Sequence, residues 1–198
     1  MSTRSGDANV GPRHPQHHKC LSSSLGRVFL LKSPHPMKHL WSPWRMTYIE
    51  NHEKQEGCIF CNAQAKGDSA ENLIAFRGKL AYVILNRYPY TSGHVMVVPF
   101  EHKPNLDDLE EAARAEVMEL TSRCMTVLRQ IYNSQGFNLG ANIGEAAGAG
   151  VVGHVHIHIV PRWKGDTNFM STLGETRVLP EALEDTYRRV REGFGLAK

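Results

Sequence analysis

Three histidines alternate with apolar residues in the run His154-Val155-His156-Ile157-His158-Ile159. Side chains of a β-strand point alternately to its two faces, so an extended run would place the three imidazoles on one face, roughly 6.5–7 Å apart. Such a row is suited to two kinds of chemistry. The imidazoles can bind a metal ion such as zinc or iron, or one neutral imidazole can attack an electrophilic phosphorus atom. A structural or solvent-facing row of histidines is the alternative without chemistry.

A glycine-rich segment precedes the histidines and contains Gly144, Gly148 and Gly150. The backbone amides of such a loop can come close to phosphate oxygens and stabilise their charge. The motif is weak by itself, but it is compatible with phosphoryl chemistry at the histidine row.

Cys58 and Cys61 form a Cys-x-x-Cys pair, which is half of a tetrahedral zinc site. The other cysteines, Cys20 and Cys124, are not well placed to complete it, so the missing ligands should be imidazoles. The candidates are His102 and His154, with His39 and His52 as alternatives. Four protein ligands leave no position for water, so a zinc ion here would be structural. Two incidental reduced cysteines are the competing interpretation.

These residues must be positioned by one domain of ordinary size, since the chain has 198 residues, of which 41% are apolar. The formal net charge of +3 is too small to predict nucleic acid as the main partner. No apolar run approaches the roughly 20 residues of a membrane-spanning helix, so no membrane partner is predicted. The cysteine content does not indicate a secreted disulfide scaffold, and we expect a reducing compartment, the cytoplasm.

Residues 1–36 differ from the rest of the chain, being rich in Ser, His, Pro and Arg with Asp7 as their only acid. We expect either a disordered tail or an upstream stretch that precedes the true translation start at Met37. A single domain is predicted over residues 37–198.

Hydrophobic patterning predicts an α+β fold with a mainly antiparallel sheet. The expected strands are 73–76, 80–86, 94–99, 137–143 and 151–161. A long helix over 107–134, capped by Asn105 or Asp107 and closed by Gly136, would pack an apolar stripe on this sheet. A last helix is expected from Pro180 onward.

The run from His154 to Val160 resembles the signature of the histidine triad (HIT) family, in which three histidines alternate with apolar residues. The likeness extends to Asn86-Arg87-Tyr88-Pro89, to Gly93-His94-Val95 and to Asn142, and it covers about residues 37–170. The segments 161–169 and 41–45 resemble the bacterial zinc-containing branch that includes diadenosine tetraphosphate phosphorylases and HIT hydrolases.

This resemblance implies a HIT-like fold and an enzyme that cleaves dinucleoside polyphosphates or nucleotide conjugates at the α-phosphate. His156 would be the nucleophile and form a transient nucleotidyl-histidine, which water or phosphate then releases. The residues around the phosphate and substrate would be His94, His158, Asn86, Asn142, Gly148 and Gly150. In the zinc-containing members the first triad histidine, here His154, is a metal ligand. The resemblance also implies a homodimer.

Two other interpretations remain open from the sequence. A nucleotide-binding sensor or interaction protein would keep the pocket but turn over little substrate, and a catalytic metal centre would use the triad as ligands. The loop after the triad is also open: Arg162 or Lys164 could contact distal phosphates and Trp163 could cover the base, or the segment is a solvated turn.

Overall fold

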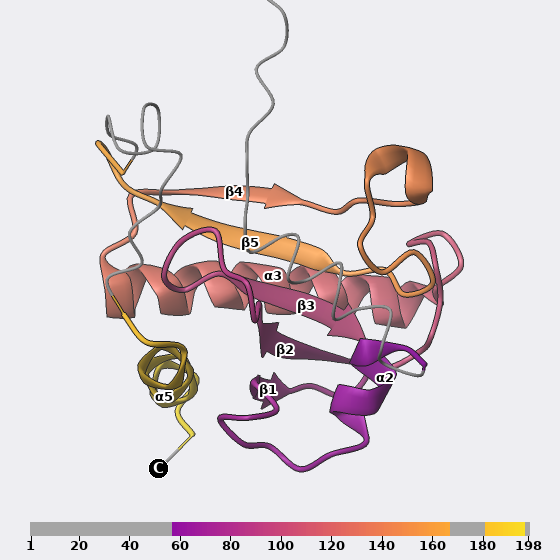
Figure 1. Cartoon of the computed structure of the whole chain (residues 1–198), viewed down its shortest axis with the longest axis horizontal. Helices are drawn as coiled ribbons and strands as arrows, with labels where there is room; N and C mark the ends of the chain where they lie inside the picture. The colour runs from indigo at the N-terminus through magenta and orange to yellow at the C-terminus, as the bar shows by residue number, and fades with distance from the viewer. Residues whose placement is uncertain (1–56, 167–180, 197–198) are drawn as a thin grey trace, which may run out of the picture. The chain divides into compact units, whose positions relative to one another are not determined.

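The structure is a computed structural model that describes residues 57–166 and 181–196. Within these residues lies a five-stranded antiparallel sheet in the order β1-β2-β3-β5-β4 (Figure 1). The strands are β1 (Ile74–Arg77), β2 (Ala81–Leu85), β3 (Val95–Pro99), β4 (Gly136–Gly140) and β5 (Ile157–Arg162). The predicted α+β class with an antiparallel sheet is confirmed.

The middle of the sheet is the most deeply buried part of the fold. Every residue of β2 and β3 is buried, as expected for continuous apolar runs. The long helix α3 (Glu111–Tyr132) lies across one face of the sheet (Figure 1). β5 pairs with β3 on one side and β4 on the other, so that His158 lies opposite both Met96 and Gly140.

β5 begins at Ile157, six residues later than the strand predicted over 151–161. The residues before it form a loop, because Val155 bonds outside the sheet: its N–H donates to the carbonyl of Lys103 (2.8 Å). The side chain of Val155 packs in a small separate cluster with Leu109 and Ala113. The alternation of apolar residues therefore extends into the loop that precedes the strand. β4 is likewise shorter than the predicted 137–143 strand.

Helix α3 begins at Glu111, four residues after the predicted start. The predicted caps are wrong: the amide of Asn105 donates instead to the carboxylate of Asp108 (2.7 Å), in a turn before the helix. The helix ends at Tyr132, where Asn133 takes the left-handed conformation (φ 51°) in place of the expected glycine. The predicted apolar stripe is confirmed by its buried members Ala113, Val117, Leu120, Cys124 and Val127.

Two shorter helices flank the sheet. Helix α2 (Ile59–Gln64) begins directly after Cys58 and was not predicted from the sequence. Helix α5 (Leu183–Gly193) buries Tyr187 and Val190, as its apolar spacing predicts. Pro180, the expected first residue of that helix, lies outside the described residues.

The predictions for residues 1–36, for the start at Met37 and for His39 and His52 as alternative ligands also lie outside the described residues. Of the helices in the described segments, none is long and apolar enough to cross a membrane.

Candidate active site and metal centre

The predicted row of three histidines is divided into two sites. The rings of His156 and His158 are in contact, with their centroids 4.9 Å apart, whereas the ring of His154 turns toward the cysteine pair. The reason is that β5 starts only at Ile157, so the two-residue alternation of a strand does not extend back to His154. His94, which directly precedes β3, completes the first group with its ring 5.2 Å from that of His158.

Hydrogen bonds fix the tautomers of two of these rings in series. The backbone N–H of Tyr90 donates to Nδ1 of His94 (3.1 Å), so that nitrogen is an acceptor and the proton of His94 is on Nε2. Nε2 of His94 lies 3.0 Å from Nδ1 of His158 and donates to it. The remaining proton of neutral His158 is then on its Nε2. A single backbone donor thus determines where both protons are held.

The tautomer of His156 is fixed independently. Its Nδ1 lies 2.9 Å from the backbone carbonyl of His154, which can only accept, so Nδ1 carries the proton. Nε2 of a neutral His156 therefore holds the lone pair. The ring is buried, with 6% of its surface exposed, and its centroid is 4.8 Å from that of Phe60.

Burial keeps this cluster neutral. Removal from water, together with the neighbouring His158 and His156, lowers the pKa of His94 to about 3. Burial and the neighbouring His156 lower the pKa of His158 to about 4. The pKa of His156 is also lowered, again chiefly by burial. Neutral imidazoles at pH 7 provide a lone pair for attack on an electrophile.

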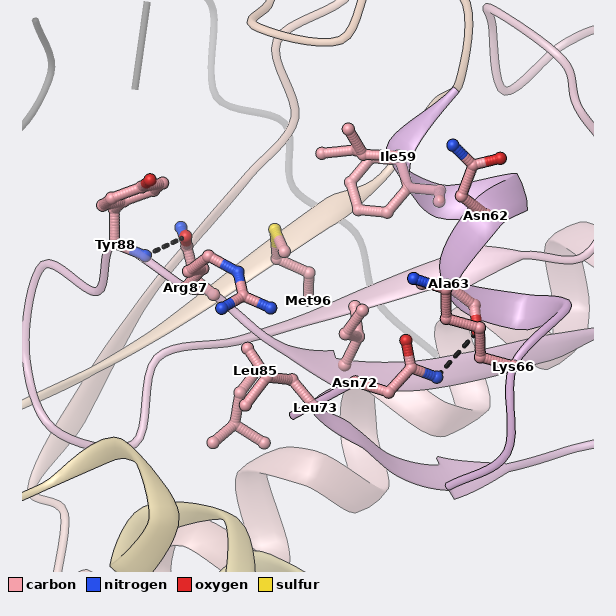
Figure 2. A pocket seen from close by; sticks show the side chains of 13 residues that line it. Ile59, Asn62, Ala63, Lys66, Asn72, Leu73, Leu85, Arg87, Tyr88 and Met96 are labelled. Carbon is pink, nitrogen blue, oxygen red and sulfur yellow. Dashed lines mark hydrogen bonds between the residues drawn. The ribbon is translucent and has the colours of Figure 1, made fainter. Parts of the chain in front are cut away.

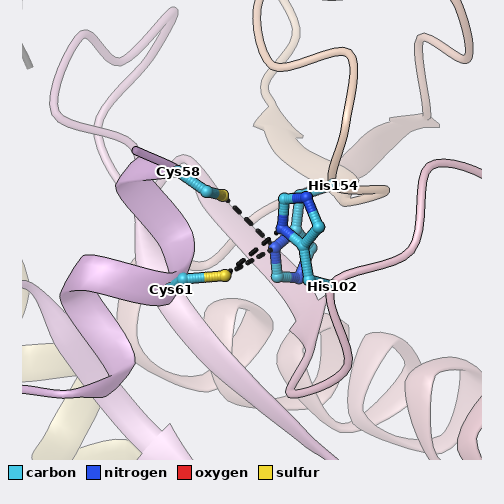
Figure 3. Close-up of side chains that lie close together, drawn as sticks. All are labelled: Cys58, Cys61, His102 and His154. Carbon is cyan, nitrogen blue, oxygen red and sulfur yellow. Dashed lines mark hydrogen bonds between the residues drawn. The ribbon is translucent and has the colours of Figure 1, made fainter. Parts of the chain in front are cut away.

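Cys58, Cys61, His102 and His154 form a second group, whose ligand atoms all lie within 4.8 Å of one another (Figure 3). The separations are 3.4 Å from Cys58 Sγ to His154 Nδ1, 3.6 Å from Cys61 Sγ to the same nitrogen, and 3.3 Å from Cys61 Sγ to His102 Nδ1. Bonds of about 2.3 Å to sulfur and 2.05 Å to nitrogen at tetrahedral angles put S and N about 3.6 Å apart. The four predicted residues are therefore brought together as a group that could hold a metal ion.

The surroundings also favour a metal at this position. Nε2 of His154 donates to the carbonyl of Pro99 (2.9 Å), which leaves Nδ1 unprotonated and facing the sulfurs. Burial and the neighbouring Cys58 raise the pKa of Cys61, so a cation between the two sulfurs would favour the thiolate. The hydroxyl of Tyr82 donates to the carbonyl of Phe60 (3.0 Å) and ties α2, which carries Cys61, to β2.

A cavity of about 200 Å³ adjoins the histidine cluster, and helix α2 forms one of its walls (Figure 2). Its lining is mixed: Phe60 and Met96 are among the apolar residues, and the polar residues are Asn62, Lys66, Asn72, Asn86, Arg87 and Tyr88. Asn86 is the link to the histidines, because its Nδ2 lies 3.4 Å from Nδ1 of His94.

The glycine loop is exposed. Asn142 donates to the carbonyl of Gly148 (3.4 Å), and both residues, like Gly150, face solvent. β4 ends at Gly140, opposite His158. The roles of these three loop residues stay predictions.

The loop after β5 has the interactions of a structured turn. Arg162 pairs with Asp166 (2.5 Å) and donates to Asn138 (2.8 Å). The indole N–H of Trp163 donates to the carbonyl of Tyr132 (3.0 Å). These bonds favour the solvated-turn interpretation over contacts with distal phosphates or with the base.

The fold and the site define a class: antiparallel α+β domains with a buried histidine cluster beside a group of two cysteines and two histidines. A family model described as HIT domain matches residues 68–165. The chain belongs to the histidine triad (HIT) family.

Three similar proteins agree with this assignment. A Mycobacterium tuberculosis protein named AP-4-A phosphorylase is 38% identical over 160 residues, which cover 77% of this chain and 82% of that protein. The asymmetrical bis(5'-nucleosyl)-tetraphosphatase of Schizosaccharomyces pombe is 32% identical over 93 residues, which cover 47% of this chain and 50% of that protein. A solved structure of a zinc-bound histidine triad family protein from Mycobacterium smegmatis matches with a TM-score of 0.57 and 25% identity, covering 70% of this chain and 94% of that one.

Proposed function

We propose that this protein is an enzyme that cleaves dinucleoside polyphosphates at the α-phosphorus through a nucleotidyl-histidine on His156. One observation carries the proposal: Nδ1 of His156 is committed to the carbonyl of His154, which leaves Nε2 as the nucleophilic nitrogen. The names of the two enzymes to which the chain is similar, a phosphorylase and a tetraphosphatase, support the substrate class.

In the first step, Nε2 of His156 forms a bond to the α-phosphorus and the bond from phosphorus to the bridging oxygen breaks. The electron pair of the broken bond stays on the oxygen of the leaving nucleotide, and the Nε2–H of neutral His158 is the hydrogen-bond donor that we assign to that oxygen; His158 keeps its proton. His94 acts through His158, because its own Nε2–H holds His158 in that tautomer. From diadenosine tetraphosphate this step releases ATP and leaves adenylyl-His156.

In the second step, another nucleophile attacks the same phosphorus and frees His156. Water would give AMP, and inorganic phosphate would give ADP. The first half-reaction is common to both outcomes, and we propose the phosphorylase outcome on the similarity to AP-4-A phosphorylase, which extends over most of both chains.

We propose that the nucleoside occupies the cavity beside Asn86, with the phosphates near Asn142 and the amides of Gly148 and Gly150. The apolar lining through Phe60 and Met96 suits a base, and exposed glycine amides suit phosphate oxygens.

The metal that we assign to Cys58, Cys61, His102 and His154 is zinc, with a structural role. The donor set and the separations of the ligand atoms fit tetrahedral zinc. When bound, the ion would hold α2 against the segment that carries His156. We further propose a cytoplasmic homodimer; the exposed Leu139 and Ile143, on and just after the edge strand β4, offer apolar surface to a second copy.

The test is product analysis with diadenosine tetraphosphate, with and without inorganic phosphate. ADP plus ATP formed only with phosphate supports the phosphorylase; AMP plus ATP without phosphate identifies a hydrolase instead. The substitution His156→Ala should remove both turnover and the covalent label from an α-phosphate-labelled substrate; the label of the wild type is trapped by denaturation at alkaline pH and identified by its release in acid. Thr126→Ala, on the exposed face of α3, is the control for expression and handling. Binding without turnover or label would favour the sensor interpretation.

A further inference from the structure

Two backbone carbonyls fix the orientation of the side-chain amide of Asn72. Its Nδ2 donates to the carbonyls of Ala63 (2.7 Å) and Gly67 (3.0 Å), which uses both of its hydrogens. The reverse orientation would set the amide oxygen against two carbonyl oxygens, so it is excluded. Oδ1 is thus a fixed acceptor, and it has no partner among the described residues.

This acceptor faces the cavity beside the histidine cluster. Figure 2 shows Nδ2 of Asn72 turned toward Ala63 and Oδ1 turned toward the open space of the pocket. Phe60, Leu73 and Met96 are among the apolar walls of that space, and Asn62, Lys66, Asn86, Arg87 and Tyr88 are its other polar walls. A polar atom whose orientation is fixed by the fold allows a binding site to distinguish ligands that can donate to it from those that cannot.

Asn72 is bonded to the last turn of helix α2, whereas the first turn of that helix contacts the histidine cluster. Phe60, in the first turn of α2, contacts the ring of His156, and Ala63, in its last turn, is bonded to Asn72. Ala63 follows Phe60 by three residues, a rise of roughly 4.5 Å along the helix, so Asn72 lies about one helical turn beyond the contact with His156.

We propose that Asn72 determines base specificity by accepting a hydrogen bond from the exocyclic amino group of a 6-aminopurine. This inference rests on the proposed function, since it takes the cavity to be the nucleoside site. A base without that amino group leaves Oδ1 unpaired, and Asn72 cannot turn to compensate because Ala63 and Gly67 hold its nitrogen.

The test is a cycle of two substrates and three proteins. The substrates are diadenosine tetraphosphate and the analogue with purine riboside in place of adenosine, which lacks only the amino groups. The wild type should prefer the adenosine compound by about tenfold in kcat/KM, and Asn72→Leu should treat the two alike. Ser69→Ala is the matched control: it removes the acceptor of the Asn72 backbone N–H (3.1 Å) but leaves Oδ1 in place, so the preference should persist.

Equilibrium binding of AMP and of purine riboside monophosphate separates this proposal from the catalytic one. Tighter binding of AMP by about tenfold, lost in Asn72→Leu, supports the role of Asn72 even if no dinucleotide is turned over. Equal affinities of the wild type for both monophosphates, failure to bind AMP, or a preference that survives in Asn72→Leu would overturn it. Comparing two ligands on the wild type keeps the test decisive if Asn72→Leu does not fold.

Discussion

The buried, neutral state of His94 makes a quantitative prediction about acid stability. Its pKa is about 3 in the folded protein, against an ordinary value of about 6.5, because its ring is removed from water and lies beside His158 and His156. Below pH 6.5 the unfolded chain binds a proton at this residue that the folded protein does not bind. The free energy of unfolding must therefore fall as the pH is lowered from 6.5 toward 3.

The size of this effect follows from the shift. Each pH unit below 6.5 costs about 1.4 kcal/mol per such histidine, so His94 alone should remove about 2.7 kcal/mol between pH 7.5 and pH 4.5. His94→Asn removes this titrating group. Its amide can still accept from the N–H of Tyr90, and the pKa of His158 is set by burial and His156, so neither neighbour should change greatly.

The assay is urea unfolding of the wild type and His94→Asn at pH 7.5, 6.0 and 4.5, followed by tryptophan fluorescence at a fixed metal concentration. The variant will be the less stable protein at pH 7.5, where its packing is poorer, but its stability should fall less steeply with acid. The gap between the two should close by about 2.7 kcal/mol at pH 4.5. Since metal loss at low pH affects both proteins, it cancels in the difference. Parallel curves would refute the reasoning, because they would mean that His94 titrates equally in both states.

Three further predictions concern the framework. Cys61→Ala should abolish stoichiometric zinc binding, measured by mass spectrometry of the dialysed protein, and should lower the melting temperature. Cys124 is a buried cysteine on α3, so the Cys124→Ala variant should keep its zinc. Equal metal contents in the two variants would show that Cys61 is not a ligand. Glu116→Ala should lower the free energy of unfolding by about 1–3 kcal/mol in urea titrations, because its carboxylate accepts the N–H groups of Lys79 and Leu80 at 2.6 Å each; an unchanged midpoint would contradict this. Gly93→Ala should cost about 2 kcal/mol or more by the same assay, since its φ is +78° and a β-carbon would lie 3.0 Å from the ring of Tyr132; a neutral effect would show that the turn before His94 adapts.

The sequence was sufficient for the sheet and for the membership of the metal group. The strands at 81–85 and 95–99 are continuous apolar runs, which need no tertiary information to be recognised. The Cys-x-x-Cys spacing, with too few cysteines to supply four sulfurs, left histidines as the remaining ligands, and the structure brings His102 and His154 to that pair.

What the sequence could not provide was the rotation of His154 out of the histidine row. The alternation of residues 154–159 is the same whether the segment is strand or loop, and only the bond from Val155 to Lys103 decides between them. Helix α2 was missed for a similar reason, since six residues are too few for helical periodicity to be recognised. Asn72 belongs to no motif: the role that we propose for it depends on the carbonyls of Ala63 and Gly67, which meet its side chain only in the folded chain.

The two sites are joined through one residue, His154. Its side chain belongs to the group around Cys58 and Cys61, while its backbone carbonyl accepts the Nδ1–H of His156. A ring held by a metal, and by the carbonyl of Pro99, leaves its own backbone little freedom to rotate, so the carbonyl stays aimed at His156. The metal that we propose would thus orient the proposed nucleophile without contacting substrate, by fixing the acceptor that selects the tautomer of His156. In this proposal a structural metal site lies two residues from the reactive histidine because the rigidity of His154 would set the orientation of His156.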